Sequence, residues 1–73
     1  MSTISPKQIA YIGHLMVERG IAKRFDYGDA KQFIAKQMGN MSYLPWNAPM
    51  SWASDLIDAL KDPAFAFETI NQD

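Results

Sequence analysis

The chain has 73 residues and a mass of 8.3 kDa, enough for one small domain. Because it has no cysteine and one histidine, we expect no disulfide and a reducing compartment, and zinc fingers, haem attachment motifs and iron–sulfur clusters are excluded. Hydrophobic residues make up 48% and charged residues 21%, which is typical of a globular domain. No run reaches about 18 apolar residues, and residues 1–8 lack the apolar core of a signal peptide.

The net charge of −1 conceals an uneven distribution. Residues 1–36 carry six basic and three acidic side chains, a net charge of +3. Residues 37–73 carry one basic and five acidic side chains, a net charge of −4. This asymmetry fits two faces for oppositely charged partners, and equally well two halves of the fold that attract each other.

The first predicted helix spans residues 5–19. Ser5, Pro6 and Gln8 form a capping box with proline at the first helical position. Gly20 follows as a residue that commonly ends a helix. The apolar stripe expected to face the core consists of Ile9, Ile12, Leu15 and Met16.

The second predicted helix spans residues 27–38, with Asp26 or Asp29 as its cap and Gly39-Asn40 as its stop. Residues 39–49 form a loop rich in large side chains. We expect this loop either to pack on the core as a lid or to present a binding surface.

The third predicted helix spans residues 48–61, with Asn47 or Ser51 as its cap. Residues 62–73 are either a mobile tail or a short fourth helix that begins at Asp62. No long alternating pattern indicates a strand, so the predicted fold is all-α, a compact single-domain bundle of three helices, with the fourth as an addition.

The sequence offers little for catalysis. His14 falls on the solvent side of the first helix, without a pocket or an orienting partner. Asp55 and Asp58 lie three residues apart on one helix face, which a solvated surface explains better than acid–base chemistry. The glycines occur singly and make no phosphate-binding loop. We therefore expect no enzyme, no cofactor and no metal site.

A basic face is the first candidate binding surface. Arg19, Lys23 and Arg24 cluster in sequence, with aromatic residues interleaved. Such a face could lie near RNA or an acidic partner. An overall pI near 5.6 argues against duplex recognition, as does the acidic character of the third helix.

Protein binding is better supported by the composition. Trp46, Phe65 and Phe67, with the acidic Asp55 and Asp58, are the candidate contact residues for a basic segment of another protein. The alternative is that the two tryptophans complete an undersized core, which applies more to Trp52 than to Trp46.

Two segments resemble a small helical module of phage and bacterial proteins of unknown function. Residues 5–12, continuing to Leu15 and to residues 18–20, resemble its opening, and residues 53–61 resemble its closing helix. Residues 21–50 are longer and more aromatic than is usual for that module, so we expect any specialised function to reside there.

The small size, the lack of cysteine and the general appearance of the chain also resemble the small transcription regulators of lytic bacteriophages. This resemblance implies binding to host bacterial RNA polymerase, inhibition of initiation by interference with sigma-factor engagement, and antitermination, all in the host cytoplasm. The implied partners are the β′ subunit, with the β subunit and a Nus-type elongation factor as further candidates. It assigns no contact residues.

Two other interpretations stay open. One is a small DNA-binding or single-stranded nucleic-acid-binding accessory module. The other is a module that caps or tethers a larger assembly.

Overall fold

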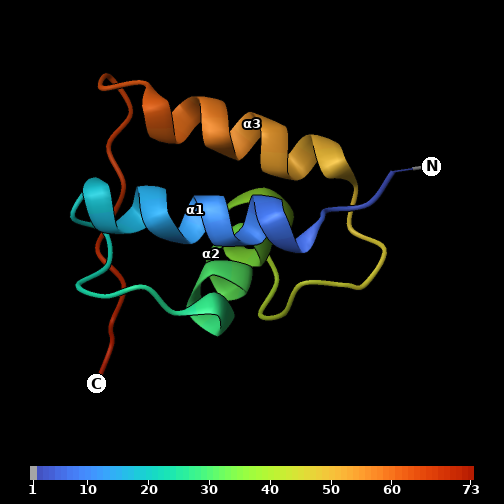
Figure 1. Cartoon of the computed structure of the whole chain (residues 1–73), viewed down its shortest axis with the longest axis horizontal. Helices are drawn as coiled ribbons and strands as arrows, with labels where there is room; N and C mark the ends of the chain where they lie inside the picture. Colours follow the sequence, from blue (N-terminus) through green and yellow to red (C-terminus); the bar gives the residue numbers. More distant parts are fainter. Residues whose placement is uncertain (1) are drawn as a thin grey trace.

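Three helices make up the regular structure of the described residues. The computed structural model describes residues 2–73 and contains α1 (Pro6–Glu18), α2 (Tyr27–Gly39) and α3 (Met50–Lys61). The predicted all-α bundle of three helices is confirmed. α1 and α3 run side by side in the same direction, α2 crosses them, and all three pairs are in contact (Figure 1). Within the described residues, the only β structure is an isolated bridge between Thr3 and Pro49.

Local signals determine both ends of α1. The predicted capping box is present: Gln8 N–H donates to Ser5 Oγ (3.2 Å), and Ser5 N–H donates to Gln8 Oε1 (3.0 Å). At the other end Gly20 adopts a left-handed conformation with φ of 75°. That conformation lets Ile21 N–H donate to the carbonyl of Met16 (2.9 Å) and closes the helix.

Of the two predicted caps of α2, the structure uses the first. The Asp26 carboxylate accepts a hydrogen bond from the Asp29 N–H (2.9 Å). The predicted stop after Gly39 is also present. Its left-handed residue is Asn40, with φ of 50°, whose N–H donates to the carbonyl of Ala35.

The predicted start of α3 was wrong. Neither Asn47 nor Ser51 caps this helix, because Pro49 occupies the cap position without a side-chain hydrogen bond. The first turn instead finds a backbone partner: Met50 N–H donates to the carbonyl of Ser2 (3.1 Å). A partner so distant in sequence replaces the local cap and anchors the N-terminal segment to α3.

Residues 62–73 do not form a fourth helix. One turn begins at Asp62, whose carboxylate accepts from Ala64 N–H (2.9 Å). The chain then crosses the end of α1 without regular secondary structure (Figure 1). We call residues 62–73 the tail. There Ile70 N–H donates to the carbonyl of Ile21 (2.9 Å), which joins the tail to the loop after α1.

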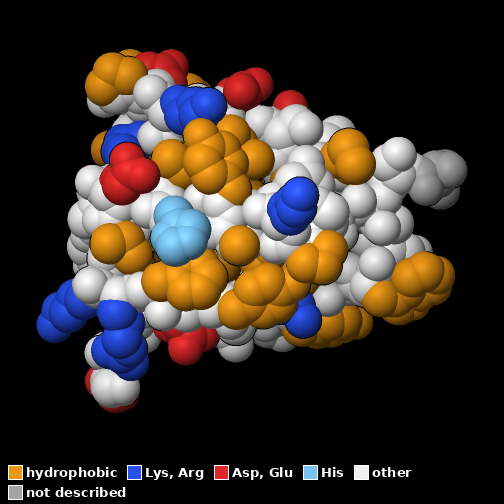
Figure 2. All heavy atoms as spheres, in the orientation of Figure 1, with side chains coloured by type: hydrophobic (Ala, Val, Ile, Leu, Met, Phe, Trp, Pro, Cys, Tyr) orange, Lys and Arg blue, Asp and Glu red, His pale blue; other side chains and the backbone are white. Residues whose placement is uncertain are grey.

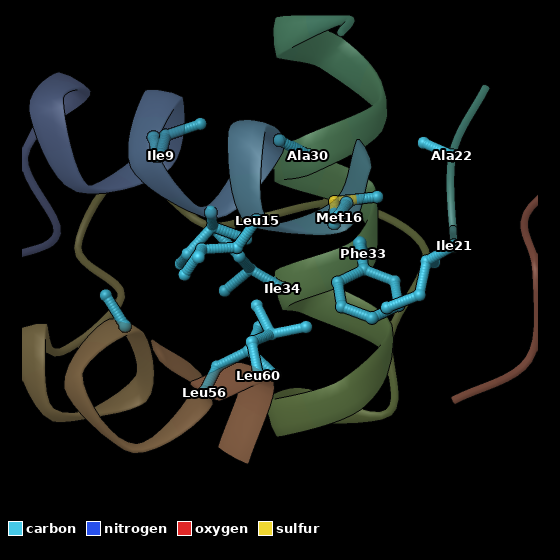
Figure 3. Close-up of a cluster of buried hydrophobic side chains, with 12 residues drawn as sticks. Ile9, Leu15, Met16, Ile21, Ala22, Ala30, Phe33, Ile34, Leu56 and Leu60 are labelled. Carbon is cyan, nitrogen blue, oxygen red and sulfur yellow. The ribbon is translucent and has the colours of Figure 1, made fainter. Parts of the chain in front are cut away.

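A single apolar cluster lies where the three helices meet. Figure 3 shows Leu15, Ile34, Leu56 and Leu60 converging from all three of them. Each buried aliphatic side chain of this size stabilises the fold by about 1.5–3 kcal/mol. The remaining buried members are Ile9, Ile12, Met16, Ile21, Ala22, Ala30, Phe33 and Ala53.

Candidate protein-binding surfaces

The five residues predicted to bind a protein do not form one surface. Trp46 lies in the loop before α3, whereas Phe65 and Phe67 lie in the tail after it. α3 has 12 residues, so at 1.5 Å per residue it is about 18 Å long. Figure 1 shows the loop and the tail at opposite ends of this helix. The aromatic residues therefore belong to two separate ends of the molecule.

Trp46 is the most exposed large hydrophobic residue described. Its side chain is 90% exposed, whereas Trp52 is half-buried against the core. The six-membered part of the Trp52 indole lies so close to Gly39 that a Cβ there would be 2.7 Å from it. The core therefore takes one tryptophan, as expected for Trp52, and leaves Trp46 in solvent.

Beside Trp46 the surface is hollowed. We call this depression of about 150 Å³ the aromatic hollow. Three elements meet there: the N-terminal segment leading into α1, the first turns of α2, and the loop before α3. Most of its lining residues are hydrophobic, but the surface that faces the hollow is slightly more polar than apolar. The lining residues are Ile4, Pro6, Ile9, Tyr27, Lys31, Leu44, Pro45 and Trp46.

A second depression adjoins the first. We call it the second hollow; its volume is about 200 Å³. Lys31 and Leu44 line both hollows and so form a shared wall. The rest of its lining consists of Gly28, Gln32, Ser42 and Tyr43, and the surface that faces the hollow is slightly more apolar than polar. Tyr43 is 68% exposed, so the two most exposed aromatic side chains flank the same lysine.

Figure 2 shows the face of the molecule that carries His14. Hydrophobic side chains form a band below His14, coloured pale blue, and basic side chains stand at its edges. Phe25 stacks on the His14 imidazole with the ring centroids 4.6 Å apart. It also covers Gly13, where a Cβ would lie 2.5 Å from the Phe25 ring. His14 is exposed, as expected, and it supports an aromatic ring on the surface.

At the opposite end, Arg19 holds the tail. Its guanidinium donates through Nη1 to the carbonyls of Leu60 (2.6 Å) and Asp62 (3.3 Å), and through Nη2 to that of Phe65. It also lies 5.6 Å from the centroid of the Phe67 ring. Arg19, predicted for a basic face, is thus engaged within the molecule.

The two other predicted basic residues contact the last residues of the tail. Gln72 Oε1 accepts from the Lys23 N–H (2.8 Å), and Gln72 Nε2 donates to the Arg24 carbonyl (3.0 Å) and to Asp29 Oδ2 (2.9 Å). Arg24 Nη2 donates to the Asp73 carbonyl (2.9 Å). Both Lys23 and Arg24 are exposed.

The two aromatic residues of the tail differ in their surroundings. Phe67 is half-buried and packs on Phe33, with the ring centroids 5.7 Å apart. Phe65 is 53% exposed. Of the two, Phe65 has the larger part of its surface in solvent.

The acidic residues lie on the solvent face of α3. Asp55 and Asp58 are both exposed. Near the end of this helix, Lys61 Nζ lies 5.3 Å from the Tyr11 ring centroid. A hydrogen bond to Tyr11 and the charge of the Tyr11 side chain raise the pKa of Lys61 above the usual 10.5. The Asp58 carboxylate raises this pKa further. This face therefore carries both signs of charge at its C-terminal end.

Residues 2–73 contain no group of three histidine, aspartate or glutamate side chains placed to hold a metal ion. Over the same residues, no helix combines the length and apolar character that crossing a bilayer requires. No family model, curated protein or solved structure matches the chain.

Lys31 and Tyr27 were not predicted to contact a protein. They lie four residues apart on α2, a spacing that places two side chains on the same helix face. That spacing is the feature of the sequence that could have identified the two residues as neighbours. The approach of Ile4 and Pro6 from the other end of the chain had no local signal.

Proposed function

We propose that this chain is a phage-encoded, non-enzymatic regulator that binds bacterial RNA polymerase in the host cytoplasm. The observation that carries the binding role is Trp46, 90% exposed beside a surface hollow. Exposed tryptophans next to pockets are frequent anchors of protein interfaces. The choice of RNA polymerase rests on the resemblance to small phage transcription regulators.

Binding would act on transcription by selecting polymerase states. A protein that binds one conformation or assembly of the polymerase more tightly than another shifts the population toward it. Interference with sigma-factor engagement would inhibit initiation, and persistent binding during elongation would favour antitermination. The β′ subunit is the proposed principal contact, with the β subunit and a Nus-type elongation factor as additional ones.

The acidic face of α3 supports a secondary role in association. Asp55 and Asp58 are exposed on one helix face, so they could attract a basic polymerase segment over a distance of about one Debye length. This contribution affects the association rate more than the affinity and weakens as salt is raised.

Retention of purified RNA polymerase on the immobilised chain tests the proposal. We expect the β′ and β subunits to be retained, and the Trp46→Ala variant to weaken binding about tenfold or more. Phe65→Ala removes an exposed aromatic side chain from the opposite end and serves as the matched control. Failure of the unmodified chain to retain polymerase would refute the proposal.

Nucleic-acid binding is the second candidate, favoured by the exposed Lys23 and Arg24 next to Phe25, which is 41% exposed. A gel-shift titration over a range of salt concentrations tests it. Tight binding that weakens steeply with salt supports this function, and the absence of a shift removes it.

A further inference from the structure

We propose that the loop after α1 and the start of α2 form a binding site selective for a primary carboxamide. We call it the amide site; it consists of the backbone of Lys23 and Arg24 and the carboxylate of Asp29. The Gln72 side chain fills it while the tail is in place. When the end of the tail moves away, a glutamine side chain of a protein partner takes the site. The proposed function enters only in that the partner is a protein.

Every hydrogen-bonding group of the Gln72 amide has a partner at this site. Its Oε1 accepts from the N–H of Lys23 (2.8 Å) and from the N–H of Arg24 (3.3 Å). Its Nε2 donates to the carbonyl of Arg24 (3.0 Å) and to Oδ2 of Asp29 (2.9 Å). A primary amide has an oxygen that accepts two hydrogen bonds and a nitrogen that donates two. The site therefore matches the full hydrogen-bonding capacity of this group.

The same arrangement discriminates against groups of similar shape. A carboxylate has no N–H to donate to the Arg24 carbonyl, and the Asp29 carboxylate would repel its charge. A hydroxyl group offers one donor where the site holds two acceptors. A site built to hydrogen-bond a ligand rejects analogues that leave its polar groups unpaired. Selectivity for a primary amide follows from the positions of these four groups.

A partner can reach the amide site because its occupant belongs to an irregular segment at the surface. Both Lys23 and Arg24 are exposed. Among the described residues, one backbone–backbone hydrogen bond joins residues 66–73 to the rest of the chain, from Ile70 N–H to the Ile21 carbonyl. Segments held by few backbone bonds open at a lower free-energy cost than packed helices. The end of the tail is therefore the part of the fold most easily exchanged for an outside ligand.

Two matched substitutions test the recognition within the chain. Gln72→Glu keeps the size of the side chain, removes both donors and adds a negative charge beside Asp29. We expect the amides of Lys23 and Arg24 to exchange with solvent about fivefold faster. Asn71→Asp makes the same chemical change at the neighbouring exposed residue and should leave both rates unchanged. Unchanged rates in Gln72→Glu, or equal acceleration in the two variants, would overturn the inference.

A vacated site tests the ligand class directly. In Gln72→Ala, propionamide should produce saturable amide shifts at Lys23 and Arg24. Propionate has the same shape but no donors, and it should bind about fivefold more weakly or less. The unmodified chain should respond more weakly to propionamide than the variant, because its own glutamine competes at a high effective concentration. Absence of shifts in the variant, or equal binding of propionate, would contradict the amide site.

Two further probes identify the outside ligand. The peptide acetyl-Gly-Gln-Gly-N-methylamide should act on the Gln72→Ala variant like propionamide, and its Glu counterpart like propionate. Cytidine also presents an amino group next to an acceptor on its pairing edge. The chain itself fills the site with a glutamine, which favours a side chain over a base. Tighter binding of cytidine than of the Gln peptide would refute the assignment to a protein partner.

The amide site and the proposed function fail separately. If polymerase is retained but the amide probes do not bind, the amide site is wrong and the proposed function stands. If the amide probes bind but polymerase is not retained, the proposed function is wrong and the amide site stands.

Discussion

The two tryptophans show how the same side chain serves different purposes in one small domain. Trp52 fills space against Gly39 and the core, whereas Trp46 is 90% exposed beside a hollow. Helical spacing with Leu56 predicts the inward position of Trp52. No comparable pattern applies to Trp46, because prolines on both sides prevent regular structure.

Replacing each tryptophan by alanine should therefore affect stability very differently. Trp52→Ala removes a half-buried ring from the core, and we expect a loss of about 2 kcal/mol in the free energy of unfolding. Trp46→Ala should change it by less than about 0.5 kcal/mol, since the ring is in solvent. Urea denaturation measures both. Equal losses for the two variants would contradict the assignment of these residues.

The contact between Tyr11 and Lys61 predicts a measurable change in titration. Because the folded state raises the pKa of Lys61 above 10.5, its contribution to stability is present below about pH 10.5 and is lost as the pH rises through the folded-state value. Tyr11→Phe should move the pKa back toward 10.5. Nitrogen NMR of the lysine ammonium groups follows this titration, and an unchanged pKa in the variant would exclude Tyr11 as the cause.

At the scale of elements, short-range signals predicted the ends of α1, whereas the expected local caps of α3 were wrong because its start depends on a distant partner. The Ser5 capping box and the left-handed Gly20 act within a few residues, so the sequence predicts both ends of α1. The start of α3 depends on Ser2, and the path of the tail depends on Arg19. These partners lie more than 40 positions apart, and a single sequence carries no local pattern for such contacts.

The tail offers a direct test of this long-range contact. Arg19→Ala removes the donors to three tail and helix-end carbonyls, and we expect the unfolding free energy to fall by about 1–2 kcal/mol. Amides of the tail such as Ile70 should exchange with solvent faster. Lys23→Ala, a nearby exposed residue that contacts the tail through its backbone, is the control. Unchanged exchange in Arg19→Ala would show that the guanidinium does not hold the tail.

At the scale of the whole molecule, the uneven charge distribution takes a structural form. Part of the basic N-terminal half meets the C-terminal tail directly through Arg19 and Arg24. Lys31 and the acidic residues of α3 remain exposed at the surface. Arg19 and Arg24 donate to backbone carbonyls and not to acidic side chains, so both interpretations of the charge asymmetry stay predictions.

Transcription by purified bacterial RNA polymerase tests the central claim that the Trp46 end of this chain regulates the polymerase. With a sigma-dependent promoter and an intrinsic terminator on one template, the chain should lower initiation and raise read-through. Trp46→Ala should lose both effects and Phe65→Ala should retain both. If the unmodified chain leaves both quantities unchanged, or if Trp46→Ala acts as strongly as the unmodified chain, the claim is contradicted.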